Sequence, residues 1–230
     1  MSADSTSVIK ALEGGLIVSC QAPVDSPLHD PGVIAAIAQA AVNQGAVGVR
    51  IDTPAHIKAV RQKVTAPIIG LWKQQISTYE VYITPQFAHA AAIAAAGADI
   101  IAIDATQRNR PRNETVTSLI TQIHNQLGKL VMADVDTIAA ACAAQAAGAD
   151  IVGTTLYGYT PQTQQLIPPG FDLLIQIVEK LDVPAICEGG ISSPQMARQA
   201  LDLGSYAVVV GTAITGIDYQ VKAYQQAIQS

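Results

Sequence analysis

The sequence predicts an α/β protein, a (β/α)8 or TIM barrel in which residues 1–230 form a single domain, and three observations support this class. Short β-branched runs that end in a polar residue alternate with longer Ala-rich stretches that have helical spacing and end in Gly. The alternation yields eight strand–helix pairs, which is the count of such a barrel. The chain has 230 residues, 50% of them hydrophobic, and barrels of this length commonly form one domain. A doubly wound open sheet is the rival fold, but it does not require the complete count of eight.

The individual strands and helices follow from the same two sequence patterns. We expect strands at 16–21, 46–52, 67–73, 99–105, 130–136, 150–156, 184–189 and 206–212, and helices at 31–44, 54–64, 86–96, 115–127, 137–147, 171–181, 193–203 and 217–229. Pro67 and Pro184 each begin a strand, a position that tolerates the missing N–H donor. Four glycines are predicted to stop helices in the left-handed conformation: Gly45, Gly97, Gly148 and Gly204.

Composition argues against several classes of protein. A net charge of −5, no long basic run, and only two Phe and one Trp disfavour nucleic-acid binding. The sequence contains no run of about eighteen apolar residues, so no membrane span is expected. The N-terminal residues do not resemble a signal peptide. The three cysteines show no CxxC pair, so reduced thiols in a cytoplasmic protein are expected. No metal is expected, because the histidines also lack ligand spacing; only one of them, His29, is placed to line a pocket.

Polar residues end most of the predicted strands. In a barrel these positions converge at the C-terminal mouth, where active sites lie. A single polar strand end often only meets solvent, but seven together, with both signs of charge, favour a site: Gln21, Arg50, Lys73, Asp104, Asp134, Thr155 and Glu188. Asp104 has an alternative role, since it could brace the loop that follows it. Glu188 stands out because burying a carboxylate costs several kcal/mol unless it is paired.

Glycines follow the last two predicted strands. Gly189 and Gly190 come after the seventh strand, and Gly211 and Thr212 end the eighth. Loops after strands 7 and 8 commonly bind phosphate in barrels of this class, and glycine allows backbone amides to approach the oxygens. The alternative is that these glycines only form tight corners; their placement after both strands favours a phosphate site.

Short motifs across nearly the whole chain resemble one known family, N-acylglucosamine-6-phosphate 2-epimerase, also called N-acetylmannosamine-6-phosphate 2-epimerase. The matching stretches are GGLIVSCQA (14–22), PLHD (27–30), PIIG with Lys73 shortly after, YITP (82–85), DIIAIDATQRNRP (99–111), MAD (132–134), TTLYGYT (154–160), CEGGI (187–191) and VVVGTAIT (208–215). The resemblance implies a cytoplasmic, cofactor-free enzyme of amino-sugar and sialic acid breakdown. Such an enzyme interconverts N-acetylmannosamine 6-phosphate and N-acetylglucosamine 6-phosphate.

The resemblance also implies roles for single residues. Lys73 matches the family's catalytic lysine and Glu188 its partner glutamate. The sugar-contacting positions match Gln21, Arg50 and Asp134, to which we add Thr155, and the phosphate cradle matches Gly189, Gly190 and Gly211, to which we add Thr212. The chain departs from the family around these contacts, at Ile51-Asp52-Thr53, at Thr212 and at Gly216-Ile217, where the family often has an arginine.

The chemistry that this reaction needs explains the residue types. Inversion at C2 removes a proton next to the C1 carbonyl and returns it on the other face. Lys73 can serve as the base if burial and a nearby Arg50 lower its pKa, and Glu188 would accept hydrogen bonds or deliver the proton. Three alternatives remain open: a Lys73–Glu188 ion pair that only fills the mouth, a Schiff-base aldolase or lyase with Lys73 as nucleophile, and a non-catalytic sugar-phosphate binding protein.

Two further features concern the surface. The last predicted helix places Ile217, Val221, Tyr224 and Ile228 on one face, which suggests a homodimer or, alternatively, a helix that covers the barrel. The loop at 107–113 carries three arginines that could attract an anionic substrate, although a solvated loop explains them equally well.

Overall fold

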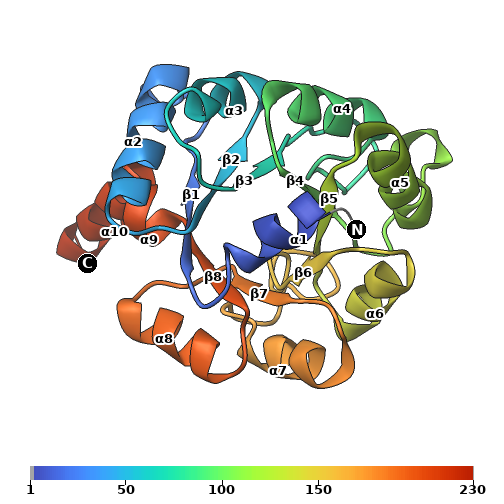
Figure 1. Ribbon diagram of the computed structural model, residues 1–230. Helices are drawn as coiled ribbons and strands as arrows, with labels where there is room; N and C mark the ends of the chain where they lie inside the picture. The colour runs from blue at the N-terminus through green and yellow to red at the C-terminus, as the bar shows by residue number, and fades with distance from the viewer. Residues whose placement is uncertain (1–2, 230) are drawn as a thin grey trace.

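The protein is a closed barrel of eight parallel strands surrounded by helices, as the computed structural model shows for residues 3–229 (Figure 1). Each strand pairs with the next along the chain, and the last pairs with the first through Leu16↔Val208, Ile17↔Val209 and Val18↔Val210. This closing pair confirms the predicted barrel and excludes the open sheet. None of the helices in the described part of the chain is long and apolar enough to cross a membrane.

All eight predicted strands and all eight predicted helices are present. The strands are β1 Leu16–Cys20, β2 Gly48–Asp52, β3 Ile68–Leu71, β4 Ile100–Asp104, β5 Leu130–Asp134, β6 Ile151–Gly153, β7 Ala185–Glu188 and β8 Ala207–Val210. The helices are α2 Pro31–Asn43, α3 Pro54–Arg61, α4 Phe87–Ala96, α5 Val116–Gln122 with a π-helical continuation η2 at Ile123–Leu127, α6 Ile138–Ala146, α7 Phe171–Lys180, α8 Pro194–Asp202 and α10 Ile217–Gln229. The strands are shorter than predicted, so Gln21, Lys73 and Thr155 lie just beyond the strands they follow.

Three short elements were not predicted: α1 Ala3–Lys10, the 3₁₀ turn η1 Pro111–Asn113, and α9 Thr212–Thr215. Helix α1 lies across one end of the barrel (Figure 1). The residues that follow it insert Leu12, which is fully buried, and a Cβ on Gly48 would come within 2.8 Å of the Leu12 side chain. The sequence of α1 is mostly polar, so packing against the barrel, rather than periodicity, holds it in place.

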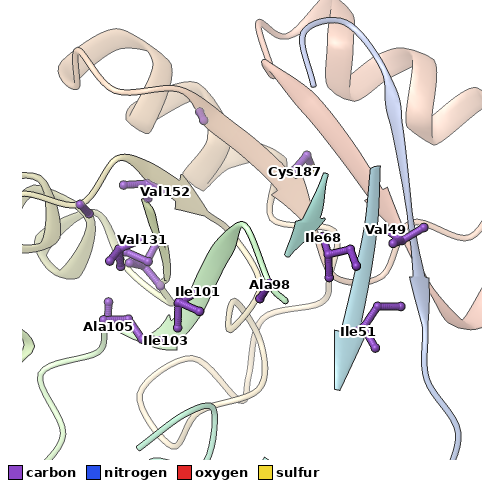
Figure 2. Close-up of a cluster of buried hydrophobic side chains, with 14 of the residues drawn as sticks. Val49, Ile51, Ile68, Ala98, Ile101, Ile103, Ala105, Val131, Val152 and Cys187 are labelled. Atoms are coloured by element: carbon purple, nitrogen blue, oxygen red, sulfur yellow. The ribbon is translucent and has the colours of Figure 1, made fainter. Parts of the chain in front are cut away.

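The core forms two layers because side chains alternate along each strand. Residues that point inward, such as Ile17, Ile69 and Ile186, form one buried cluster inside the barrel. Residues that point outward pack under the helices, and Figure 2 shows part of this second cluster, with Val49 and Ile51 from β2 and Ile68 from β3. The mouth therefore receives only the inward-pointing positions at the strand ends.

The helix ends follow the predicted chemistry. The four glycines predicted to stop helices all have left-handed φ values, between 94° and 108°: Gly45, Gly97, Gly148 and Gly204. Side-chain oxygens of Asp30, Thr137 and Ser193 cap the starts of α2, α6 and α8. These caps fix where each helix leaves the loop that follows a strand.

The last helix does not cover the barrel. Helix α10 lies beside α9, and none of its described residues is buried. The four residues predicted to share a face are 56% to 77% exposed: Ile217, Val221, Tyr224 and Ile228. The alternative that this face packs on the barrel is therefore wrong.

Candidate active site

A cavity of about 890 Å³ opens at the C-terminal end of the barrel, which we call the mouth. Most of the predicted site residues line it: Gln21, Arg50, Lys73, Thr155, Glu188, Gly189, Gly190, Gly211 and Thr212. Asp134 lies at the same end and is fully buried by the side chains that bond to it. The volume is within the usual range for small-molecule sites. The structure thus brings the predicted residues together at one end of the barrel.

A buried arginine joins two carboxylates across the mouth. Arg50 in the middle of β2 is 1% exposed and bonds both oxygens of Asp134 on β5, with Nη1–Oδ1 and Nη2–Oδ2 distances of 3.0 and 2.7 Å. Its Nη1 also lies 2.8 Å from Oε2 of Glu188 on β7. Bidentate pairing of this kind is strong and directional. We call these three residues the Arg50 clamp.

Thr155, just past β6, connects the two carboxylates of the clamp. Its hydroxyl lies 2.6 Å from Asp134 Oδ1 and 3.3 Å from Glu188 Oε2, so its single proton goes mainly to Asp134. Burial raises the pKa of Glu188 to about 7, and the nearby Asp134 charge adds to this, while Arg50 and Thr155 oppose it. Glu188 can therefore take up or release a proton near neutral pH.

Lys73 stands in the mouth two residues beyond β3. Its Nζ donates to Oε1 of Gln21 at 2.5 Å, and Gln21 Nε2 donates to Ser19 Oγ at 2.9 Å. Solvent reaches the side chain from the open side, but the surrounding walls desolvate it, and this burial is the main cause that lowers the pKa of Lys73. Arg50 lowers it further. Glu188 bonds Arg50, so the structure does not show the simple Lys73–Glu188 ion pair that would only fill the mouth.

The loops after β7 and β8 form the glycine-lined side of the cavity. Gly189 and Gly190 have φ values of 99° and 72°, which favour glycine. A Cβ on Gly190 would lie 2.5 Å from Cβ of Pro168, and one on Gly211 would lie 3.3 Å from Cβ of Ser19. The backbone is therefore packed tightly here, against Pro168 at Gly190 and, at Gly211, against Ser19, which also lines the cavity.

Asp104, the remaining polar strand end, braces the arginine loop. Its carboxylate lies 2.7 Å from Arg108 Nη2 and 3.8 Å from Arg110 Nη2, and it also accepts from the Thr106 hydroxyl. Arg108 and Arg110 line a separate cavity of about 480 Å³ rather than the mouth. Of the two roles considered for Asp104, bracing is the one that the structure shows.

Several residues of the mouth were not predicted from the sequence to be site residues. Asp52 accepts a hydrogen bond from the Lys73 backbone N–H, and Tyr82, from the loop after β3, lines the wall. Burial and then the Asp134 charge raise the pKa of Tyr82 to about 12, so its phenol stays protonated. His29, the histidine expected near the pocket, does line it. Asp52 had a signal in the sequence, because it ends a strand, whereas Tyr82 lies in an irregular loop.

The described residues offer no cluster for a metal. Across residues 3–229, no three His, Cys, Asp or Glu side chains are grouped so that they could hold an ion.

A closed parallel barrel with a lysine, a near-neutral glutamate and a glycine-lined wall in one cavity defines the class of (β/α)8-barrel proteins with an acid–base site. Residues 34–230 match the family model described as "Putative N-acetylmannosamine-6-phosphate epimerase". The chain therefore belongs to this family of epimerases, and the resemblance seen in its motifs is confirmed.

Individual relatives agree over nearly the whole chain. Two proteins named "Putative N-acetylmannosamine-6-phosphate 2-epimerase" are 63% identical over 95% of both chains (Thermosynechococcus vestitus) and 58% identical over 99% of both (Synechococcus elongatus). The solved structure of the N-acetylmannosamine-6-phosphate 2-epimerase from Clostridium perfringens superposes with a TM-score of 0.91 at 38% identity, covering 95% of each chain.

The clamp predicts a large effect of neutralising Asp134. Asp134→Asn keeps the shape but leaves Arg50 with one charged partner, and the free energy of unfolding is expected to fall by about 3 to 5 kcal/mol. Thr155→Val removes only a hydroxyl and should cost about 1 kcal/mol. Chemical denaturation measures both, with the exposed Asp182→Asn as a charge control. Equal stabilities of Asp134→Asn and the control would contradict the clamp.

Proposed function

We propose that the chain interconverts N-acetylmannosamine 6-phosphate and N-acetylglucosamine 6-phosphate by removing and returning the proton at C2. The observation that carries this proposal is that Lys73 and Glu188 line one cavity, with the pKa of each moved toward neutrality from opposite sides. Groups poised near the working pH are efficient in proton transfer. Membership in a family of epimerases supports the same substrate class.

The reaction needs two proton transfers at one carbon. In the open-chain sugar the C1 aldehyde makes the C2 proton acidic, and the neutral amine of Lys73 removes it. The electron pair left at C2 delocalises onto the carbonyl oxygen, which gives an enediolate-like anion. A proton returned to the opposite face of C2 completes the inversion, and no electrons are gained or lost. We therefore propose that the reaction is cofactor-free.

Glu188 is the proposed partner of Lys73. Its carboxyl group faces the cavity from β7, whereas Lys73 enters from beyond β3. In its protonated form Glu188 can donate to the developing oxyanion or to C2, and in its charged form it can accept from a sugar hydroxyl. The raised pKa makes both forms accessible in one turnover.

The remaining residues have proposed roles in holding the substrate. Gln21, Arg50 and Thr155 line the cavity and can contact the sugar and its acyl group, while Asp134 acts through Arg50 from below. The loops with Gly189, Gly190, Gly211 and Thr212 are proposed to hold the 6-phosphate by backbone amides. This separation places phosphate binding and proton transfer on different elements.

We make two further proposals, on the cellular location of the protein and on its oligomeric state. We place the enzyme in the cytoplasm, because all three cysteines are free, and the exposed Cys142 is suited to a reducing compartment. We also propose a homodimer in which α10 contacts a second copy, because its exposed face carries four large apolar residues: Ile217, Val221, Tyr224 and Ile228.

Activity of site variants tests the proposed function. Lys73→Ala is expected to lower kcat by on the order of 10² to 10⁴, since a positioned base is lost. Glu188→Gln should also lower kcat, because it keeps the shape but not the proton. Conversion of N-acetylmannosamine 6-phosphate followed by NMR in heavy water measures both the rate and deuterium at C2 of the product, with Lys63→Ala, exposed on the outside, as control.

Binding and trapping separate the alternatives. Affinity for N-acetylglucosamine 6-phosphate, measured by calorimetry, should change little in Lys73→Ala because the phosphate loops are intact. Borohydride should trap no adduct on Lys73; an adduct would favour the aldolase. Near wild-type turnover in Lys73→Ala, or a product without deuterium at C2, would overturn the proposed mechanism.

Light scattering tests the dimer. The wild-type protein should be dimeric at micromolar concentration, and Tyr224→Glu should shift it to monomer because a charge enters the apolar face. Gln226→Glu adds the same charge to another face of α10 and should remain dimeric. A monomeric wild-type protein would remove this proposal.

A further inference from the structure

Asp52 lies at the base of Lys73. It is the last residue of β2, it is half-buried, and it lines the cavity. Strands β2 and β3 pair up to Asp52↔Leu71, and the Thr53 N–H continues the ladder to Leu71 O at 3.0 Å. Asp52 Oδ1 then accepts the Lys73 backbone N–H at 3.0 Å. A side chain thus replaces the ladder at the point where β3 has already ended.

This bond fixes one side of the segment that carries Lys73. The other side is held by a single antiparallel bridge between Lys73 and Ile83, flanked by bonds from Gln74 N to Tyr82 O and from Thr84 N to Trp72 O. Without the Asp52 carboxylate, the Lys73 backbone would lose its hydrogen bond to β2. The position of the Lys73 backbone, from which the amine enters the cavity, is therefore held in part by this carboxylate.

Several charged groups surround Lys73, and Asp52 is the one among them that is not part of the clamp. Arg50 faces the lysine from β2, Glu188 from β7 and Asp134 from β5, and in the clamp both carboxylates are bonded to Arg50. Gln21, which holds the amine, is neutral, and Tyr82 stays protonated. Asp52 is the carboxylate with the strongest effect on Lys73, and besides the lysine it faces His56, whose pKa burial lowers.

We propose that Asp52 is a positioning residue for Lys73, which it holds through the backbone and whose ammonium form its carboxylate stabilises. Asp52 thereby raises the pH above which the amine is free to act. Only this consequence for catalysis rests on the proposed function. The carboxylate opposes the effects of burial and Arg50, so that Lys73 remains a stronger base than it would otherwise be.

Two substitutions separate the hydrogen bond from the charge. Asp52→Asn keeps an oxygen that can accept the Lys73 N–H but removes the negative charge. Asp52→Ala removes both. Asp182→Asn, before β7 and exposed, changes the net charge equally and serves as the control. All three are compared in the full chain, and denaturation curves establish that each is folded.

Direct titration of Lys73 is the first readout. Protein labelled with ¹³C at lysine Cε gives a resonance for each lysine by NMR, and Lys73→Arg assigns the one that matters. In Asp52→Asn the Lys73 resonance should titrate at lower pH than in the wild type, and in Asp182→Asn it should not move. An unchanged Lys73 titration in Asp52→Asn would overturn the inference, and this result does not depend on which substrate the enzyme converts.

Amide exchange and pH–rate profiles complete the test. Exchange of the Lys73 amide should accelerate by about tenfold in Asp52→Ala, the equivalent of one hydrogen bond, and stay close to wild type in Asp52→Asn. The acid limb of kcat/KM should move to lower pH in Asp52→Asn. If the titration moves while Lys73→Ala remains active, Asp52 has its proposed effect on Lys73 and the proposed function fails. If Lys73→Ala is inactive and exchange and titration are both unchanged, the inference fails alone.

Discussion

The buried guanidinium of Arg50 is the interaction on which the mouth depends. Two carboxylates from β5 and β7 lie beside it, and neither could stay charged at that depth without it, since an isolated buried charge costs several kcal/mol. Only a closed barrel brings β2, β5 and β7 to face one another across an interior. The polar mouth therefore depends on the closure of the sheet.

Burial and the clamp together account for two groups of opposite type that can both work near neutral pH. One arginine serves two carboxylates, so Glu188 shares its positive partner with Asp134 and is not held fully ionised. Arg50 at the same time makes the mouth unfavourable for an ammonium group, which affects Lys73. Burial thus raises the pKa of Glu188 and lowers that of Lys73, the directions that proton transfer at carbon requires, and Arg50 adds to the shift of Lys73 while it only partly opposes that of Glu188.

Most of the fold and much of the site could be predicted from the sequence, because strand period, helix-stop glycines and polar strand ends are local signals. Helix α1 could not, since its place depends on Leu12 fitting beside Gly48 rather than on its own residues. The strand ends predicted which residues meet at the mouth, but not their partners: that Glu188 bonds Arg50 rather than Lys73 depends on barrel register. Asp52 was noted only as a departure from a motif, and its bond to Lys73 arises where β3 ends.

Direct titration of Glu188 tests this view of the mouth most sharply. Carboxyl-¹³C labelling of glutamate, with the Glu188 resonance assigned by Glu188→Gln, follows its protonation by NMR in the unliganded protein. Burial, only partly opposed by an Arg50 that is shared with Asp134, predicts a midpoint near neutrality, at about 7. A midpoint near the roughly 4.3 of an exposed glutamate would contradict it, because Glu188 would then be a permanently charged partner of Arg50 and could not exchange a proton with the substrate.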